Sequence, residues 1–162
     1  MSQSQLMRRL AMILRRNPWA VVAAKRVYGL TRPHFTMGVV GVLFNSRGQV
    51  LMVEHVFHPY LPWGLPGGWV ERNEHPGDSL RRELREELTI EAEIGAILVV
   101  DNFEPHHLDL AYLCRGPETV GPLSFELLGC QWVEPDQLPP THEFHRLAIQ
   151  RGQAMRALEL RA

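Results

Sequence analysis

The segment LPGGWVERNEHPGDSLRRELREELTI, residues 65–90, joins a glycine pair to a stretch that is typical of an amphipathic helix. We expect a helix over Pro76–Leu88, because a proline is tolerated in the first turn and Asp78 complements the positive end of the helix dipole. Leucines recur every four residues along this stretch, so they should share one side and anchor it in a core. These residues are Leu80, Leu84 and Leu88.

Three glutamates of the same stretch, Glu83, Glu86 and Glu87, are spaced i, i+3 and i+4. At about 100° per residue they share one sector of the helix, next to the leucines. Their carboxylates repel one another, at a cost of roughly a few tenths of a kcal/mol per exposed pair. A hard divalent cation that is bound through oxygen atoms would relieve this repulsion. For the helix alone, a solvated glutamate face supported by Arg82 pairing with Glu86 is an alternative interpretation.

The loop before the helix favours a ligand site over a solvated face. Gly67 and Gly68 allow backbone conformations that other residues avoid, and they permit close approach by a ligand. Glu74 adds a fourth carboxylate just before the helix. A glycine pair, an acid six residues on and then Arg-Glu-x-x-Glu-Glu form a pattern that is not expected by chance.

This pattern resembles the signature of the Nudix hydrolases, G-x5-E-x7-R-E-U-x-E-E-x-G-U, in which U is a bulky aliphatic residue. The match extends from Gly68 to Ile90, and every charged position is present at the correct spacing. One position departs from the signature: Thr89 stands where the family usually has a glycine that ends the helix and binds no metal. The matching residues are Gly68, Glu74, Arg82, Glu83, Leu84, Glu86, Glu87 and Ile90.

The resemblance implies a pyrophosphatase reaction on a phosphorus-containing acid anhydride, namely hydrolysis of a nucleoside diphosphate linked to another group X. Water would attack a phosphorus atom, with magnesium or manganese (Mg²⁺ or Mn²⁺) bound. By the same resemblance, Glu83, Glu86 and Glu87 would hold the metal, together with the backbone carbonyl of Gly67. Either Glu83 or Glu86 would polarise the attacking water.

Further site residues follow from the resemblance by position. Arg82 would orient Glu83 through a charged hydrogen bond. Glu74 would support the metal ligands or bind a second metal. Glu126 resembles the extra acidic ligand that the family places before the last strand. That transfer rests on position alone, so Glu118 and Glu104 remain alternatives.

The group X should be recognised by loops outside the signature. Several aromatic and histidine side chains lie near the loop that leads to the glycine pair, where they could stack on a base or contact substrate. Ordinary packing is the alternative for each of them. The candidates are Phe57, His58, Tyr60, Trp63 and His106, with Trp69 as a further stacking residue.

The rest of the chain predicts an α/β (α+β) fold. Residues 37–44 and 49–56 are expected to be strands around a turn at 45–48, which suggests a hairpin. Strands flanked by separate helices indicate a mixed β-sheet with helices on both sides. The resemblance implies that this is the Nudix-type α/β/α sandwich. Further strands are expected over 91–103, 108–115 and 125–133, and a closing helix over 143–160 with Phe144, Leu147, Ala148, Met155 and Leu158 inside.

A basic arm precedes an acidic body. Residues 1–53 carry eight basic residues and no acid, although the net charge of the chain is only −1. We therefore expect a basic amphipathic helical extension over residues 1–33, and the resemblance implies a Nudix hydrolase domain over residues 34–162. The extension could pack on its own domain, join two subunits as a homodimer or, less in keeping with its short apolar face, lie on a membrane. The near-zero net charge gives no reason to expect nucleic acid as a partner.

Two other functions remain open beside the hydrolase of soluble nucleotides. One is a nucleotide-sensing Nudix module without turnover, although such modules usually have eroded acids. The other is a hydrolase of a lipid or isoprenoid diphosphate at a membrane surface. With only two cysteines, Cys114 and Cys130, free thiols in a reducing cytoplasmic setting are the simpler expectation.

Overall fold

The computed structural model describes residues 3–102 and 105–159. The chain separates into two compact units, Met1–His34 and Phe35–Ala162. The first unit holds helix α1 (Gln3–Arg16) and helix α2 (Pro18–Leu30), and no residue of α2 is buried. Within the described residues, no helix is long and apolar enough to cross a bilayer.

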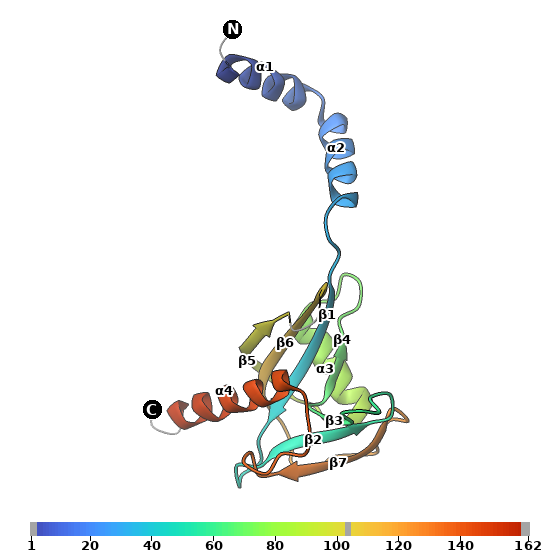
Figure 1. Ribbon diagram of the computed structural model, residues 1–162, viewed down its shortest axis with the longest axis vertical. Coiled ribbons are helices and arrows are strands. Elements are labelled where there is room, and N and C mark those ends of the chain that lie inside the picture. Colours follow the sequence, from blue (N-terminus) through green and yellow to red (C-terminus); the bar gives the residue numbers. More distant parts are fainter. Residues whose placement is uncertain (1–2, 103–104, 160–162) are drawn as a thin grey trace. The chain divides into compact units, whose positions relative to one another are not determined.

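The second unit is built on a four-stranded mixed sheet in the order β4-β1-β6-β5. Its central strands β1 (Thr36–Leu43) and β6 (His107–Arg115) run parallel. The outer strands β4 (Gly67–Trp69) and β5 (Glu93–Asp101) pair antiparallel with β1 and β6 respectively. The expected mixed sheet is therefore confirmed (Figure 1).

A second, antiparallel sheet has the order β3-β2-β7, with β3 (Trp63–Gly64), β2 (Val50–His55) and β7 (Leu127–Val133). The expected hairpin between the first two strands is wrong, because only one isolated bridge, Phe44 to Val50, joins them. Both edges of β1 are already occupied by β4 and β6, so β2 can extend only into the other sheet.

Helices α3 (Pro76–Leu88) and α4 (Glu143–Glu159) cover opposite faces of the mixed sheet (Figure 1). Successive side chains of β1 and β6 point to opposite faces of the sheet, so each strand contributes residues to the interface with α3 and to the interface with α4. One face of these strands packs with α3 in one hydrophobic cluster, and the other face packs with α4 in a second cluster. The predicted α/β/α sandwich is thus confirmed.

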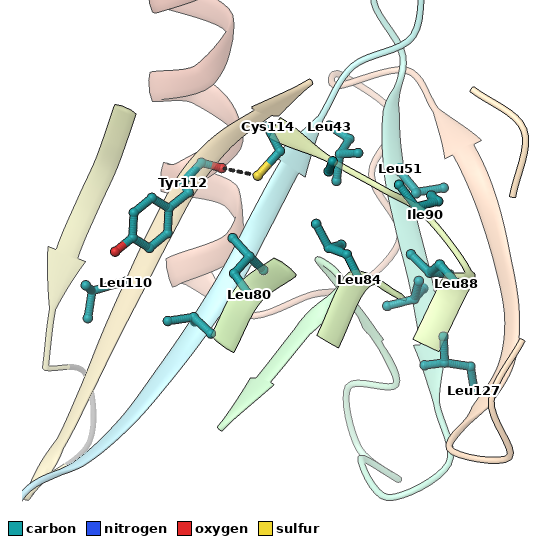
Figure 2. Packing of buried hydrophobic residues seen from close by; sticks show 13 residues of the cluster. Leu43, Leu51, Leu80, Leu84, Leu88, Ile90, Leu110, Tyr112, Cys114 and Leu127 are labelled. Atoms are coloured by element: carbon teal, nitrogen blue, oxygen red, sulfur yellow. Dashed lines mark hydrogen bonds between the residues drawn. The ribbon is translucent and has the colours of Figure 1, made fainter. Parts of the chain in front are cut away.

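The leucines of α3 form the centre of the first cluster, as the sequence predicts. Leu80, Leu84 and Leu88 are fully buried, and Figure 2 shows them facing side chains from both sheets. Burial of one such leucine is worth about 1.5–3 kcal/mol. This anchoring fixes the rotation of α3, and hence the direction in which its glutamates point.

The inner face of α4 is partly different from the prediction. Phe144 and Ala148 are buried as expected, but Leu158 is 67% exposed. Gly152 approaches the sheet closely, and it is the last buried residue of the helix. Leu158 follows in the final turns, beyond that contact, whereas Ile149 is a core residue that the prediction omitted.

Candidate active site

The glycine pair brings the backbone of β4 against the α3 glutamates. Gly67 has φ +146°, and a Cβ there would lie 2.0 Å from the carbonyl oxygen of Val39, so only glycine fits. Its N–H donates to Oε2 of Glu87 at 3.0 Å. A Cβ at Gly68 would lie 2.6 Å from the carboxyl carbon of Glu83. The missing side chain of Gly67 therefore lets β4 approach β1 closely, and that of Gly68 makes room for Glu83 beside the strand.

Local interactions fix the beginning of α3. His75 precedes the helix in an extended conformation, and its Nδ1 accepts a hydrogen bond from the N–H of Gly77 at 3.1 Å. This cap satisfies one of the free N–H groups of the first turn. Pro76 occupies the first turn, where its missing N–H has no cost.

Thr89 ends α3 without the glycine that the signature usually has. Its backbone is left-handed, with φ 57° and ψ 35°, which is unfavourable for a β-branched residue. The hydroxyl of Thr89 donates to the carbonyl of Pro122 at 3.1 Å, and the N–H of Gly121 donates to the carbonyl of Leu88 at 2.9 Å. Contacts with Gly121 and Pro122 thus hold the end of α3, where the family usually has a glycine cap.

The three clustered glutamates differ greatly in exposure. Glu87 is 4% exposed, whereas the side chains of Glu83 and Glu86 are 16% and 59% exposed. Burial raises the pKa of Glu87 to about 8, and repulsion from Glu83, Glu126 and Glu86 adds to this, against the hydrogen bond from Gly67. Burial also raises the pKa of Glu83. The deepest carboxylate therefore carries the largest cost of ionisation.

Arg82 connects the acids of the loop and the helix. Its Nε and Nη2 each lie 3.1 Å from one oxygen of Glu74, which is a bidentate pair. Its Nη1 lies 2.8 Å from Glu83 and 3.2 Å from Glu86. The hydrogen bond expected between Arg82 and Glu83 is thus present. The bond from Arg82 lowers the pKa of Glu74 to about 2, so Glu74 is an ionised anchor for the arginine.

Of the three candidates for the additional acid, Glu126 stands beside the cluster. Its charge acts on both Glu83 and Glu87, raising the pKa of each. Glu118 instead accepts a hydrogen bond from the backbone N–H of Ser46 at 2.7 Å. Glu104 lies outside the described residues.

This donor set fits a hard divalent cation such as Mg²⁺ or Mn²⁺. The acids offer only oxygen atoms, and the buried charge of Glu87 would be stabilised by a bound cation. Across residues 3–102 and 105–159, no three His, Cys, Asp or Glu side chains already converge at metal-binding distances. Arg82 contacts Oε1 of Glu83 and Oε2 of Glu86, so each of these carboxylates has a second oxygen with which it could bind a cation.

A pocket of about 530 Å³ adjoins the acids. Gly67 and Gly68 connect the pocket with the acids, because they line the pocket and also lie against Glu87 and Glu83 respectively. Four of the five loop candidates line this pocket, namely Phe57, His58, Tyr60 and Trp63, as does Trp69.

His106 is the exception among the loop candidates. It has φ 62°, its ring lies 5.9 Å from that of Phe35, and it is absent from the pocket lining, which instead includes His107. The placement of a turn at residues 105–106 decides which of the two histidines faces the pocket.

Four histidines from two distant segments meet at the pocket: His55, His58, His142 and His145. Burial is the main cause that lowers the pKa of His55 to about 4 and that of His145 to about 3. Nδ1 of His145 accepts a hydrogen bond from the N–H of Leu65 at 3.2 Å. At neutral pH these two rings are therefore uncharged, and this wall of the pocket suits an uncharged group.

Sequence reasoning missed His107 and Asp109, which both line the pocket. They occupy alternate positions at the start of β6, on the same face as the buried Ala111. The signal was present in the sequence, because an acid at an inward position of an apolar strand is unusual.

Comparisons with known proteins identify the family of this chain. The NUDIX domain model matches residues 34–153. A MutT-like protein from Streptomyces ambofaciens is 28% identical over 107 residues, covering 65% of this chain and 68% of that protein. The 8-oxo-dGDP phosphatase NUDT18 from Danio rerio is 37% identical over 87 residues, covering 52% of this chain but only 26% of that protein.

Solved structures agree on the fold. The MutT NUDIX hydrolase from Burkholderia pseudomallei superimposes with a TM-score of 0.64 at 25% identity, over 72% of this chain and 96% of that chain. Because the family model covers most of the chain, the chain belongs to the Nudix family and is a hydrolase that acts on phosphorus-containing acid anhydrides.

Proposed function

We propose that this protein is a metal-dependent pyrophosphohydrolase that splits a nucleoside diphosphate linked to another moiety X. The observation that carries the proposal is the continuity of the aromatic pocket with the buried acids through Gly67 and Gly68. A substrate that spans both places needs a planar group at one end and a phosphate anhydride at the other. A nucleoside diphosphate has both.

The charge of the two regions supports this division of the substrate. The wall formed by His55 and His145 is uncharged at neutral pH, so it suits a nucleoside. The acids would face the diphosphate, where repulsion between anions has to be neutralised. Mg²⁺ or Mn²⁺ supplies that neutralisation and lowers the pKa of attacking water when it is bound.

We assign the roles of the acids as follows. Glu83, Glu86, Glu87 and Glu126 would hold the metal, with the carbonyl of Gly67 as a backbone ligand. Either Glu83 or Glu86 accepts the proton of the water that attacks phosphorus. Arg82 positions Glu83, and Glu74 fixes Arg82 through its bidentate pair.

We propose that residues 34–162 form the hydrolase domain, because the acids of α3 and the pocket are both built within the second compact unit, and that the extension is accessory. Its exposed apolar side chains, such as Trp19 and Leu30, suit a homodimer contact. The two free thiols suit a reducing, cytoplasmic location.

The test is phosphate release from nucleoside diphosphates, nucleotide sugars, ADP-ribose and dinucleoside polyphosphates, with Mg²⁺ and with Mn²⁺. Glu86→Gln and Glu87→Gln should each lower kcat/KM by at least about a hundredfold, because both remove a metal ligand. Glu93→Gln, an exposed acid at the start of β5, is the matched control and should retain full activity. Undiminished hydrolysis in both site variants would reject the assignment. Tight nucleotide binding without product in the unmodified protein would favour the sensing module instead.

A further inference from the structure

One end of the pocket contains a row of three residues across three strands. Gly38 of β1 is in register with Trp69 of β4 on one side and with Asp109 of β6 on the other. All three line the pocket. A Cβ at Gly38 would lie 2.5 Å from Oδ1 of Asp109 and 3.1 Å from Nε2 of His107. The absent side chain therefore makes room for the Asp109 carboxylate and the His107 ring, which lie over Gly38 beside the exposed indole of Trp69.

His107 holds this carboxylate in one orientation. Its Nε2 lies 3.0 Å from Oδ1 of Asp109, and its Nδ1 lies 2.8 Å from the hydroxyl of Thr36. Because an ionised carboxylate only accepts, Nε2 must carry the hydrogen. The ring of His107 also contacts the indole of Trp69, with ring centroids 4.8 Å apart. Three interactions from β1, β4 and β6 thus fix the pair.

Asp109 retains free capacity to accept hydrogen bonds. Only Oδ1 has a hydrogen-bond partner within the described part of the chain, and no Lys or Arg there pairs with this carboxylate. Its side chain is 22% exposed, so a ligand in the pocket can reach it. A half-buried carboxylate beside a flat aromatic ring is a recognition element for a planar group that carries N–H donors.

We propose that Asp109 is a specificity-determining residue that selects a guanine-type base, resting on the function proposed above. The edge of guanine presents two adjacent donors, N1–H and N2–H₂, to which a carboxylate can accept side by side, as it does from arginine. The base would enter the pocket, stack on the exposed indole of Trp69 and turn its donor edge toward Asp109. The same edge is present in 8-oxoguanine, so both bases satisfy the site.

The other bases lack this pair of donors. Adenine and cytosine place one amino donor beside a ring acceptor, and uracil places its N–H between two carbonyl oxygens. In each case an acceptor would face the carboxylate, with a lone pair opposed to a negative charge. A hydrogen bond to a charged group contributes enough that guanine should be favoured by about ten- to a hundredfold in kcat/KM.

The experiment compares substrates that differ only in the base. GDP-, ADP-, UDP- and CDP-glucose provide one matched set, and GDP against IDP isolates the 2-amino group, because hypoxanthine keeps N1–H but lacks N2. We expect GDP to be favoured over IDP by about tenfold. Asp109→Asn should reduce this ratio to about unity, because an amide presents one donor in place of an acceptor. Adenine substrates should change less than about threefold.

Two controls separate the possible failures. Asp101 is the cross-strand neighbour of Asp109 on β5 and does not line the pocket. Asp101→Asn should therefore leave the preference for GDP over IDP, and for guanine over the other bases, unchanged. Calorimetric titration of GDP and IDP into the unmodified protein and Asp109→Asn measures the same preference without turnover. If no substrate is hydrolysed but the GDP preference is present and lost in Asp109→Asn, the proposed function fails and this inference stands. Equal binding of GDP and IDP, or an unchanged ratio in Asp109→Asn, would overturn it.

Discussion

Glu87 should make the metal-free protein less stable as pH rises. Burial raises its pKa in the folded protein from the ordinary 4.5 to about 8. The folded state therefore holds this proton more tightly than the unfolded state does. The resulting stabilisation is fully present below pH 4.5 and is lost as pH rises through about 8.

The size of the effect follows from the two pKa values. Between pH 5 and pH 8, the free energy of unfolding should fall by about 3.5 kcal/mol because of this one group. That corresponds to a decrease of about 10 °C in Tm for a domain of this size.

The contribution of Glu87 to the free energy of unfolding can be measured by urea unfolding of the unmodified protein and of Glu87→Gln, in EDTA at pH 5, 6, 7 and 8. The glutamine oxygen can still accept the hydrogen bond from Gly67, so the substitution removes the ionisation and keeps the contact. Between pH 5 and pH 8, the free energy of unfolding of the variant should rise by about 3.5 kcal/mol relative to that of the unmodified protein. Addition of Mg²⁺ should stabilise the unmodified protein more at pH 8 than at pH 6. Stability curves that stay parallel across this range would refute the reasoning.

Three further substitutions test other parts of the structure. Gly67→Ala should destabilise the protein by more than about 3 kcal/mol in urea unfolding, because its Cβ would overlap the carbonyl of Val39; a loss below about 1 kcal/mol would contradict the close approach. Arg82→Lys should lower kcat about ten- to a hundredfold with little change in Tm, since lysine cannot make the bidentate pair with Glu74; full activity would remove Arg82 as a positioning residue. Leu84→Ala should cost about 2–5 kcal/mol in urea unfolding, and a cost under about 1 kcal/mol would mean that α3 is not anchored through the core.

Features fixed by local sequence could be predicted best. The bounds Pro76–Leu88 of α3 were predicted to the residue, because proline, the first-turn acid and the leucine spacing all act within one helix. The hairpin prediction failed because strand pairing is a property of the whole sheet. Nothing in residues 37–56 indicates that β4 and β6 occupy both edges of β1.

The same distinction applies to the site. The glutamates of α3 could be identified from spacing, since the helix itself brings them together. The pocket combines loop residues such as His58 with His142 and His145, and only the packing of α4 joins them. Asp109 lies outside the signature, and its only mark in the sequence is that it is an acid at an inward position of the apolar strand β6.

The close approach of Thr89 and Gly121 constrains the order in which these positions can change. A Cβ at Gly121 would lie 2.6 Å from Cβ of Thr89, so no larger residue is accommodated there while the threonine remains. Glycine at position 89 would vacate that space and also remove the left-handed strain of a β-branched residue. A path of single substitutions to the double variant must therefore make Thr89→Gly before Gly121→Ala, because the reverse order passes through a destabilised intermediate. The two positions should consequently behave as one coupled unit in any library that samples both.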